Sequence, residues 1–298
     1  MHIVATRPQR TVARTVTLEG IGLVTGAAVR VRFHPASPDS GIVFYRRDQP
    51  GAPAIHARVS AAIGTCRRTT LGTAGQGITL VEHLLAALAG LRIDNCWVEL
   101  DGPEPPGLDG SAAAYVRLLL QAGVVVQNRP RCIWAVQQPL TVRREGATLT
   151  LYPPPPGSAE LRLSYLLDYG TYGPIPQQRY TVRLTPGEFA REVANCRTFV
   201  TAAEARQLRE QGIGRHLRPA DIVVFGNRGP LDNRLRFADE PARHKILDLI
   251  GDLALFGADL AGHVVAYRSG HTLNVELVRR LCQMQTDAEC GRTTACAA

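Results

Sequence analysis

The chain has 298 residues, 45% of them hydrophobic and 20% charged, so its length and composition fit one large globular domain or two smaller ones. A net charge of +8 would suit a nucleic-acid binder, but aromatic residues make up only 6% and no basic run carries interleaved aromatics. We therefore expect no nucleic-acid partner, and the charge favours solubility and attraction of an anionic small substrate.

The sequence has no segment that would place the chain in a membrane. Its apolar runs, such as residues 84–91, are far shorter than the roughly 20 residues that cross a bilayer. The N-terminal residues lack the apolar core of a signal peptide. Seven cysteines without a C-x-x-C pair favour free thiols in a reducing compartment. We expect a cytoplasmic protein without a membrane span, whose contact with a membrane surface, if any, is transient.

The first part of the chain alternates with period two and then changes to a helical period. Apolar residues at 81, 84, 85 and 88 predict a helix that Gly90 closes. The expected strands are 11–17, 29–33, 41–45 and 96–100, and a second helix is expected over 111–120.

The same succession of strands and helices restarts near residue 129. The expected strands are 133–136, 140–143, 147–152, 161–166, 179–184, 221–225 and 263–267. The expected helices are 186–195, 201–211, 241–256 and 273–282, and a polar flexible tail is expected over 286–298.

Two helical segments resemble one another: 82–90 reads EHLLAALAG and 243–251 reads RHKILDLIG. The similarity indicates a duplicated unit. We expect an α+β fold with two similar domains, 1–128 and 129–285, each packing helices on a β-sheet. Domains that meet face to face would bring one histidine from each half to a shared cleft.

The helix expected over 241–256 is apolar on one face and polar on the other. At about 100° per residue, Asp248, Asp252 and Lys245 lie about 40°, 80° and 100° from His244. The stripe fits a solvated surface. It also fits a metal site, since H-x-x-x-D places an imidazole and a carboxylate one turn apart.

Two further polar groups have equally open interpretations. Glu82 and His83 begin an apolar helix, where Glu is favourable beside the helix dipole but costly to bury without a partner. His271 leaves a strand through a glycine and fits an exposed loop. Together with His244 and Asp248, these residues fit a catalytic zinc site with an open position, a Glu to accept a proton and a His to protonate a leaving amine.

The order of motifs over about residues 9–284 resembles that of the UDP-3-O-acyl-N-acetylglucosamine deacetylases, zinc amidases of lipid A synthesis. The matching segments are 20–26 (GIGLVTG), 81–90 (VEHLLAALAG), 93–95 (IDN), 108–112 (LDGSA), 197–199 (RTF), 235–237 (LRF), 243–253 (RHKILDLIGDL) and 269–274 (SGHTLN).

The resemblance implies roles for individual residues. The zinc ligands would be His83, His244 and Asp248. Glu82 would be the general base, and His271, oriented by Asp252, the general acid. Thr198 and Lys245 would polarise the acetamide carbonyl. The remaining matches imply contacts with the UDP-linked acylated amino sugar: Asp168, Tyr169, Phe199 and Arg268. An insert near 193–225 would form an apolar passage for the acyl chain.

Departures from the family pattern fall outside the metal and acid–base residues. They include Val24, Leu80, Gly170-Thr171 and the segment 214–218, and they concern the acyl-chain and nucleotide contacts. We expect a monomeric hydrolase that removes acetate from UDP-3-O-acyl-N-acetylglucosamine. The alternatives are a zinc amidase acting on a different acylated sugar, and a non-catalytic relative that binds nucleotide sugars or lipids.

Overall fold

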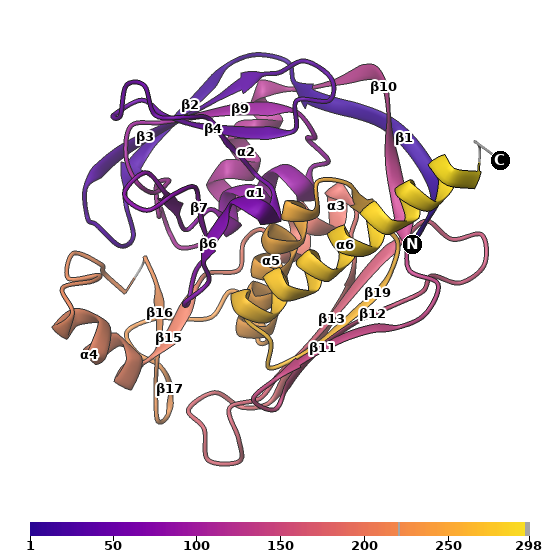
Figure 1. The fold of residues 1–298 in the computed structure, drawn as a ribbon. Coiled ribbons are helices and arrows are strands. Elements are labelled where there is room, and N and C mark those ends of the chain that lie inside the picture. Colours follow the sequence, from indigo (N-terminus) through magenta and orange to yellow (C-terminus); the bar gives the residue numbers. More distant parts are fainter. Residues whose placement is uncertain (220, 296–298) are drawn as a thin grey trace.

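A computed structural model describes residues 1–219 and 221–295. Two five-stranded sheets enclose a double layer of helices (Figure 1). The first sheet has the order β2 (Val16–Ile21), β3 (Ala28–Pro35), β9 (Cys96–Leu100), β4 (Ile42–Arg46) and β5 (Ile55–His56). The second has the order β11 (Leu140–Arg144), β12 (Ala147–Tyr152), β19 (Gly262–Tyr267), β13 (Leu161–Leu167) and β14 (Gln178–Arg183).

The two sheets have the same topology. In each, the first strand pairs antiparallel with the second and the second antiparallel with the third. The third pairs parallel with the fourth, and the fourth antiparallel with the fifth. Each half also places two helices beside its sheet: α1 (Glu82–Gly90) and α2 (Ala113–Ala122) in the first, and α5 (Glu240–Leu253) and α6 (His271–Ala295) in the second. The α+β class and the repeated unit predicted from the sequence are confirmed.

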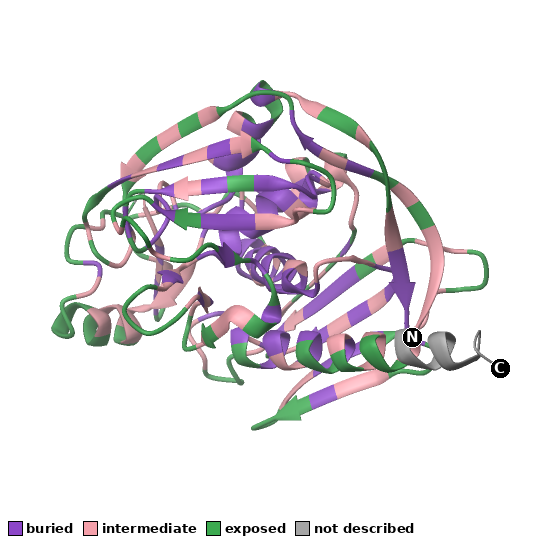
Figure 2. Ribbon diagram, turned by 45° about the horizontal axis from the view of Figure 1, so that its top comes forward, coloured by how far each residue is buried: buried purple, intermediate pink, exposed green. Residues whose placement is uncertain are grey.

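The helix α1 lies at the centre of the core. Its side chains from Leu84 to Leu88 are at most 1% exposed, as expected of a helix that is apolar on nearly every side. It packs on α2 and on α5. In the sheets the alternation follows the pleat, so Val31 and Phe33 are fully buried while the residue between them is not (Figure 2).

Long strands along one side of the molecule connect the halves. Strand β1 (His2–Val12) is antiparallel to β10 (Val124–Ala135), whose end pairs with β18 (Asp259–Leu260). Arg7 of β1 reaches Asp94 of the first half at 2.8 Å and Asp259 of the second at 2.6 Å. The domain boundary at 128/129 falls inside β10 and stays a prediction.

The other elements are short. They are η1 (Val59–Ala61), β6 (Ala62–Gly64), β7 (Thr70–Leu71), β8 (Ile78–Thr79), α3 (Pro186–Glu188), η2 (Phe189–Val193), β15 (Phe199–Thr201), α4 (Ala202–Glu210), β16 (Val223–Gly226), β17 (Gly229–Pro230) and η3 (Ala254–Phe256). Strands β15–β17 and helix α4 project from the body as a separate lobe (Figure 1). No helix within the described residues is both long enough and apolar enough to cross a membrane.

Several predicted boundaries are wrong. The strand expected over 133–136 is the end of β10, which begins at Val124 because the whole segment pairs with β1. The strand expected over 11–17 is divided between β1 and β2, because residues up to Val12 pair with β10 whereas those from Val16 pair with β3. The last helix does not end at Cys282 but continues to Ala295, since the polar residues that follow include no proline to stop it. The expected flexible tail thus overlaps a helix over 286–295, and 296–298 lie outside the described residues.

Candidate active site

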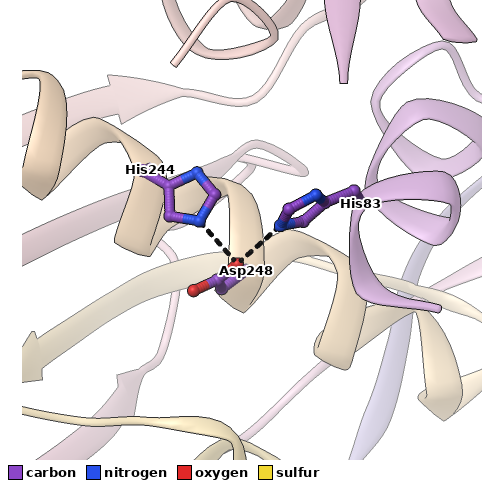
Figure 3. A group of neighbouring side chains, drawn as sticks. All are labelled: His83, His244 and Asp248. Atoms are coloured by element: carbon purple, nitrogen blue, oxygen red, sulfur yellow. Dashed lines mark ion pairs between the residues drawn. The ribbon is translucent and has the colours of Figure 1, made fainter. Parts of the chain in front are cut away.

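Three potential metal ligands meet where the two halves face one another. His83 comes from the first turn of α1, and His244 and Asp248 lie one turn apart on α5. One donor atom from each lies within 4.8 Å of the others. Asp248 Oδ1 lies 3.5 Å from His83 Nε2 and 3.3 Å from His244 Nε2, and both rings point toward that carboxylate (Figure 3).

The protonation of this group suits a divalent metal. His244 Nδ1 donates a hydrogen bond to the carbonyl oxygen of Cys196 at 3.0 Å, which leaves the Nε2 lone pair facing Asp248. Burial lowers the pKa of His244 to about 4. Although burial opposes it, the neighbouring His244 ring and Lys245 ammonium hold the pKa of Asp248 well below its usual range. Two imidazoles and an ionised carboxylate form a donor set that fits a metal with an open position.

Glu82 and His271 flank the metal-ligand group. Glu82 is 1% exposed, and burial raises the pKa of its carboxyl. Its Oε2 accepts a hydrogen bond from the backbone N–H of Thr69 at 3.1 Å, and its Oε1 lies 3.9 Å from His271 Nε2. His271 Nε2 is also 3.9 Å from Asp248. A proton acceptor and an imidazole thus border the position that a reacting group would occupy.

A buried hydrogen-bond network fixes His271. Asp252, which is 0% exposed, accepts from His271 Nδ1 at 2.8 Å, from Thr69 Oγ1 at 2.6 Å and from Asn274 Nδ2 at 2.8 Å. Burial lowers the pKa of His271, but Asp252 and Glu82 outweigh it and raise that pKa to about 9. No role for Thr69 or Asn274 was predicted from the sequence, and Thr69 has no spacing relation to the residues it contacts.

The polar stripe of α5 is not a solvated surface. His244, Asp248 and Asp252 are 2%, 4% and 0% exposed, so the metal-site interpretation of the stripe is the one that the burial supports. Lys245 Nζ donates to Asp248 Oδ2 at 2.7 Å. Burial acts against the ammonium, but Asp248 and Tyr165 raise the pKa of Lys245. The lysine remains charged beside the ligand group.

A cavity of about 690 Å³ opens over these groups. All the predicted site residues line it except Asp252, which lies behind His271. The lining includes Thr198 and the expected substrate contacts Asp168, Tyr169, Phe199 and Arg268.

Two of these expected contacts have defined partners. Phe199 packs edge-on against His244 with ring centroids 6.1 Å apart. Asp168 accepts from Tyr267 Oη at 2.6 Å and from the backbone N–H of Gly170 at 2.7 Å, and these bonds lower its pKa.

The glycine-rich turn at residues 20–26 forms part of the cavity wall through Leu23 and Val24. Its position depends on Glu104, which is 0% exposed and accepts hydrogen bonds from the backbone N–H groups of Val24 and Thr25 and from the Thr25 hydroxyl. The turn was predicted from its glycines, but Glu104 was not. The one feature that could have indicated Glu104 is that it is a charged residue in a Pro/Gly-rich loop.

The projecting lobe completes the cavity. The apolar residues that it contributes to the lining come from β15, from α4 and from the segments on either side of residue 220: Val200, Leu208, Ile213 and Ile222. They lie within the segment 193–225 in which the acyl-chain passage was expected.

This chain is similar in sequence to known proteins over nearly its whole length. A family model described as "UDP-3-O-acyl N-acetylglycosamine deacetylase" matches residues 9–283. A UDP-3-O-acyl-N-acetylglucosamine deacetylase of Thermosynechococcus vestitus is 41% identical over 277 residues, 93% of this chain and 95% of the relative. Enzymes of the same name from Myxococcus xanthus and Oleidesulfovibrio alaskensis are 39% and 38% identical, covering 92% of this chain and 86% and 89% of theirs. The chain belongs to the UDP-3-O-acyl-N-acetylglucosamine deacetylase family.

Proposed function

We propose that this protein is a zinc-dependent hydrolase that removes acetate from UDP-3-O-acyl-N-acetylglucosamine, the committed step of lipid A synthesis, as a cytoplasmic monomer. The observation that supports this best is the convergence of Glu82, His271 and the group His83, His244 and Asp248 in one buried site. The family names supply the substrate, and the site supplies groups suited to amide hydrolysis.

Zinc is the metal that we assign to the site. Two histidines and an aspartate with an open position are typical of catalytic zinc. When bound, the ion would supply Lewis acidity, which activates water and polarises a carbonyl. His83, His244 and Asp248 would hold it.

The side chains then have distinct tasks in the cleavage. Glu82 accepts a proton from the water whose oxygen adds to the acetamide carbonyl carbon. Lys245 and Thr198 stabilise the negative charge that develops on the carbonyl oxygen. The C–N bond breaks as His271 Nε2 protonates the leaving nitrogen, so the products are acetate and a free 2-amino sugar.

The size and lining of the cavity support a large amphipathic substrate. A volume of about 690 Å³ lies within the range of ligand pockets, roughly 300–1,000 Å³. Arg268 offers positive charge to a diphosphate, Asp168 and Tyr169 offer polar contacts, and the apolar residues of the lobe suit an acyl chain.

The decisive experiment compares Glu82→Gln with the wild type. We expect the variant to retain metal and to lose at least a hundredfold in turnover, as general-base catalysis contributes about 10²–10⁴. Glu210→Gln, on an exposed residue of α4, is the control and should be fully active. Unchanged turnover in Glu82→Gln would refute the assignment of Glu82 as the general base.

Substrates that differ in one group test the alternatives. We expect deacetylation of the UDP-linked, O-acylated sugar and much weaker activity without the O-acyl chain. Preference for another acylated sugar would favour a zinc amidase of different specificity. Absence of both deacetylation and stoichiometric zinc by elemental analysis would favour a non-catalytic binding protein.

A further inference from the structure

A second cavity, of about 110 Å³, lies at the other ends of the two central helices. Leu85 and Leu88 of α1 and Ile250 and Leu253 of α5 form part of its apolar wall. Its lining shares no residue with that of the 690 Å³ cavity, so it is separate from the candidate active site.

Charged groups border this apolar cavity. The lining contains four arginines and only two aspartates, an excess of two positive charges: Arg7, Arg58, Arg92, Arg131, Asp94 and Asp259. Arg7 and Arg131 each contact both aspartates at 2.6–2.9 Å. The two carboxylates are thus already paired, and the excess charge belongs to Arg58 and Arg92.

Arg92 follows the last turn of α1 with a φ of 57°. This left-handed conformation is strained for an L-residue and is the one in which glycine is usual after a helix. Its guanidinium makes no hydrogen bond or ion pair within the residues that the structure describes. A strained residue whose guanidinium makes no hydrogen bond to any described residue points to a role in binding.

The guanidinium of Arg58 also has few hydrogen bonds. In the described chain its guanidinium makes one long hydrogen bond, 3.4 Å to the carbonyl oxygen of Phe256. The group lies directly on Gly257, where a Cβ atom would be 1.5 Å from Nη1. Burial and the charge of Arg131 lower the pKa of Arg58. Burial and the charge of Arg7 lower the pKa of Arg92, although Asp259 and Asp94 act in the opposite direction. An anion would relieve this crowding of positive charge.

We propose that this cavity is a binding site for a small amphipathic anion, a carboxylate or phosphate monoester with a short alkyl chain. The head group contacts Arg58 and Arg92, and the chain lies between α1 and α5. The volume of about 110 Å³ suits a short alkyl chain, because it is smaller than the apolar cavity of about 150 Å³ that takes a benzene ring.

Calorimetric titration of the full-length, zinc-loaded protein with hexanoate and with hexyl phosphate tests the site. We expect saturable binding of at least one, which identifies the preferred head group. Hexan-1-ol, inorganic phosphate and acetate should each bind at least tenfold more weakly, since each lacks the charge or the chain. Equal affinity for hexan-1-ol and hexanoate, or no binding of either amphipathic anion, overturns the proposal.

Variants test whether the anion binds in this cavity, and whether the arginines bind it or serve only the fold. Arg92→Gly removes the charge and the backbone strain together, so we expect binding at least tenfold weaker and a higher Tm. Arg58→Met should weaken binding similarly, and Arg117→Met, on an exposed part of α2, should not. Hexanoate held by the metal site instead would bind both variants with unchanged affinity, and that result overturns the proposal.

Discussion

The substitution Asp252→Asn isolates the charge behind His271. Asn has the same shape as Asp, and its amide oxygen can still accept from His271 Nδ1 and Asn274 Nδ2 in place of Oδ2. Its NH₂ group then faces Thr69 Oγ1, whose hydroxyl can rotate to accept. The variant therefore retains packing and hydrogen bonds but loses the negative charge that stabilises protonated His271.

The size of the effect follows from the hydrogen bond that changes. A bond to a charged partner is worth about 1.5–3 kcal/mol, roughly twice a neutral one. If up to that amount of stabilisation of the charged imidazole is lost in the transition state, kcat falls about 10- to 150-fold, at 1.36 kcal/mol per tenfold. KM should change little, because Asp252 does not line the cavity.

Initial rates of acetate release measure the two constants separately, with metal content and Tm determined on the same samples. Thr69→Val removes a hydrogen bond to Asp252 but no charge, so kcat should fall less than in Asp252→Asn. A kcat within threefold of wild type in a folded, metal-loaded Asp252→Asn protein would refute the proposed coupling between the carboxylate and His271. A change confined to KM would refute it equally.

Three further substitutions probe the scaffold. Glu104→Ala should destabilise the protein by about 1–3 kcal/mol in urea unfolding and raise KM, because it leaves the donors of the 20–26 turn unpaired. Gly251→Ala should cost about 1–3 kcal/mol and lower kcat, since its Cβ would lie 2.1 Å from the Glu82 carbonyl oxygen, whereas Gly187→Ala, with nothing within 4 Å, should not affect kcat. Asp259→Asn should lose about 1–3 kcal/mol at pH 7. Although burial raises the pKa of Asp259, the arginines lower it by more in the fold. Its contribution is therefore complete above the unfolded pKa of about 3.9, declines as the pH falls below that value, and is lost once the pH passes below the folded pKa; unfolding at pH 7 and pH 3 measures the decline.

Local patterns in the sequence predicted the helices better than the sheets. The apolar spacing from Val81 to Gly90 was sufficient for α1, and the similarity of 82–90 to 243–251 indicated the repeat that the strand orders confirm. The sheet order could not be predicted, because β9 and β19 each insert between strands that precede them. Such pairings depend on contacts between distant residues, which no local period encodes.

In the candidate active site too, local spacing could be predicted from the sequence and contacts between distant residues could not. Spacing on one helix brought His244 and Asp248 together, but whether the stripe faced solvent or the other half could not be decided until α1 was found packed against α5. The contacts of Thr69 and of the Cys196 carbonyl with the site could not be predicted, for a physical reason. Each acts through a backbone or hydroxyl group positioned by the tertiary fold, so residue type alone gave no signal.

The repeated fold explains why the metal-ligand group is both shared and asymmetric. Aligning 82–90 with 243–251 places His83 and His244 at equivalent positions, so each copy contributes one imidazole from the start of a central helix. A pair of equivalent residues supplies two ligands, and the third must come from one copy alone. Asp248, whose counterpart is Ala87, would provide that third ligand. Glu82 likewise has Arg243 as its counterpart, so the second half places no carboxylate where the first has its candidate base. The two helices therefore differ where it matters for the site. A carboxylate borders the ligand group on one side, and the other side is open to substrate.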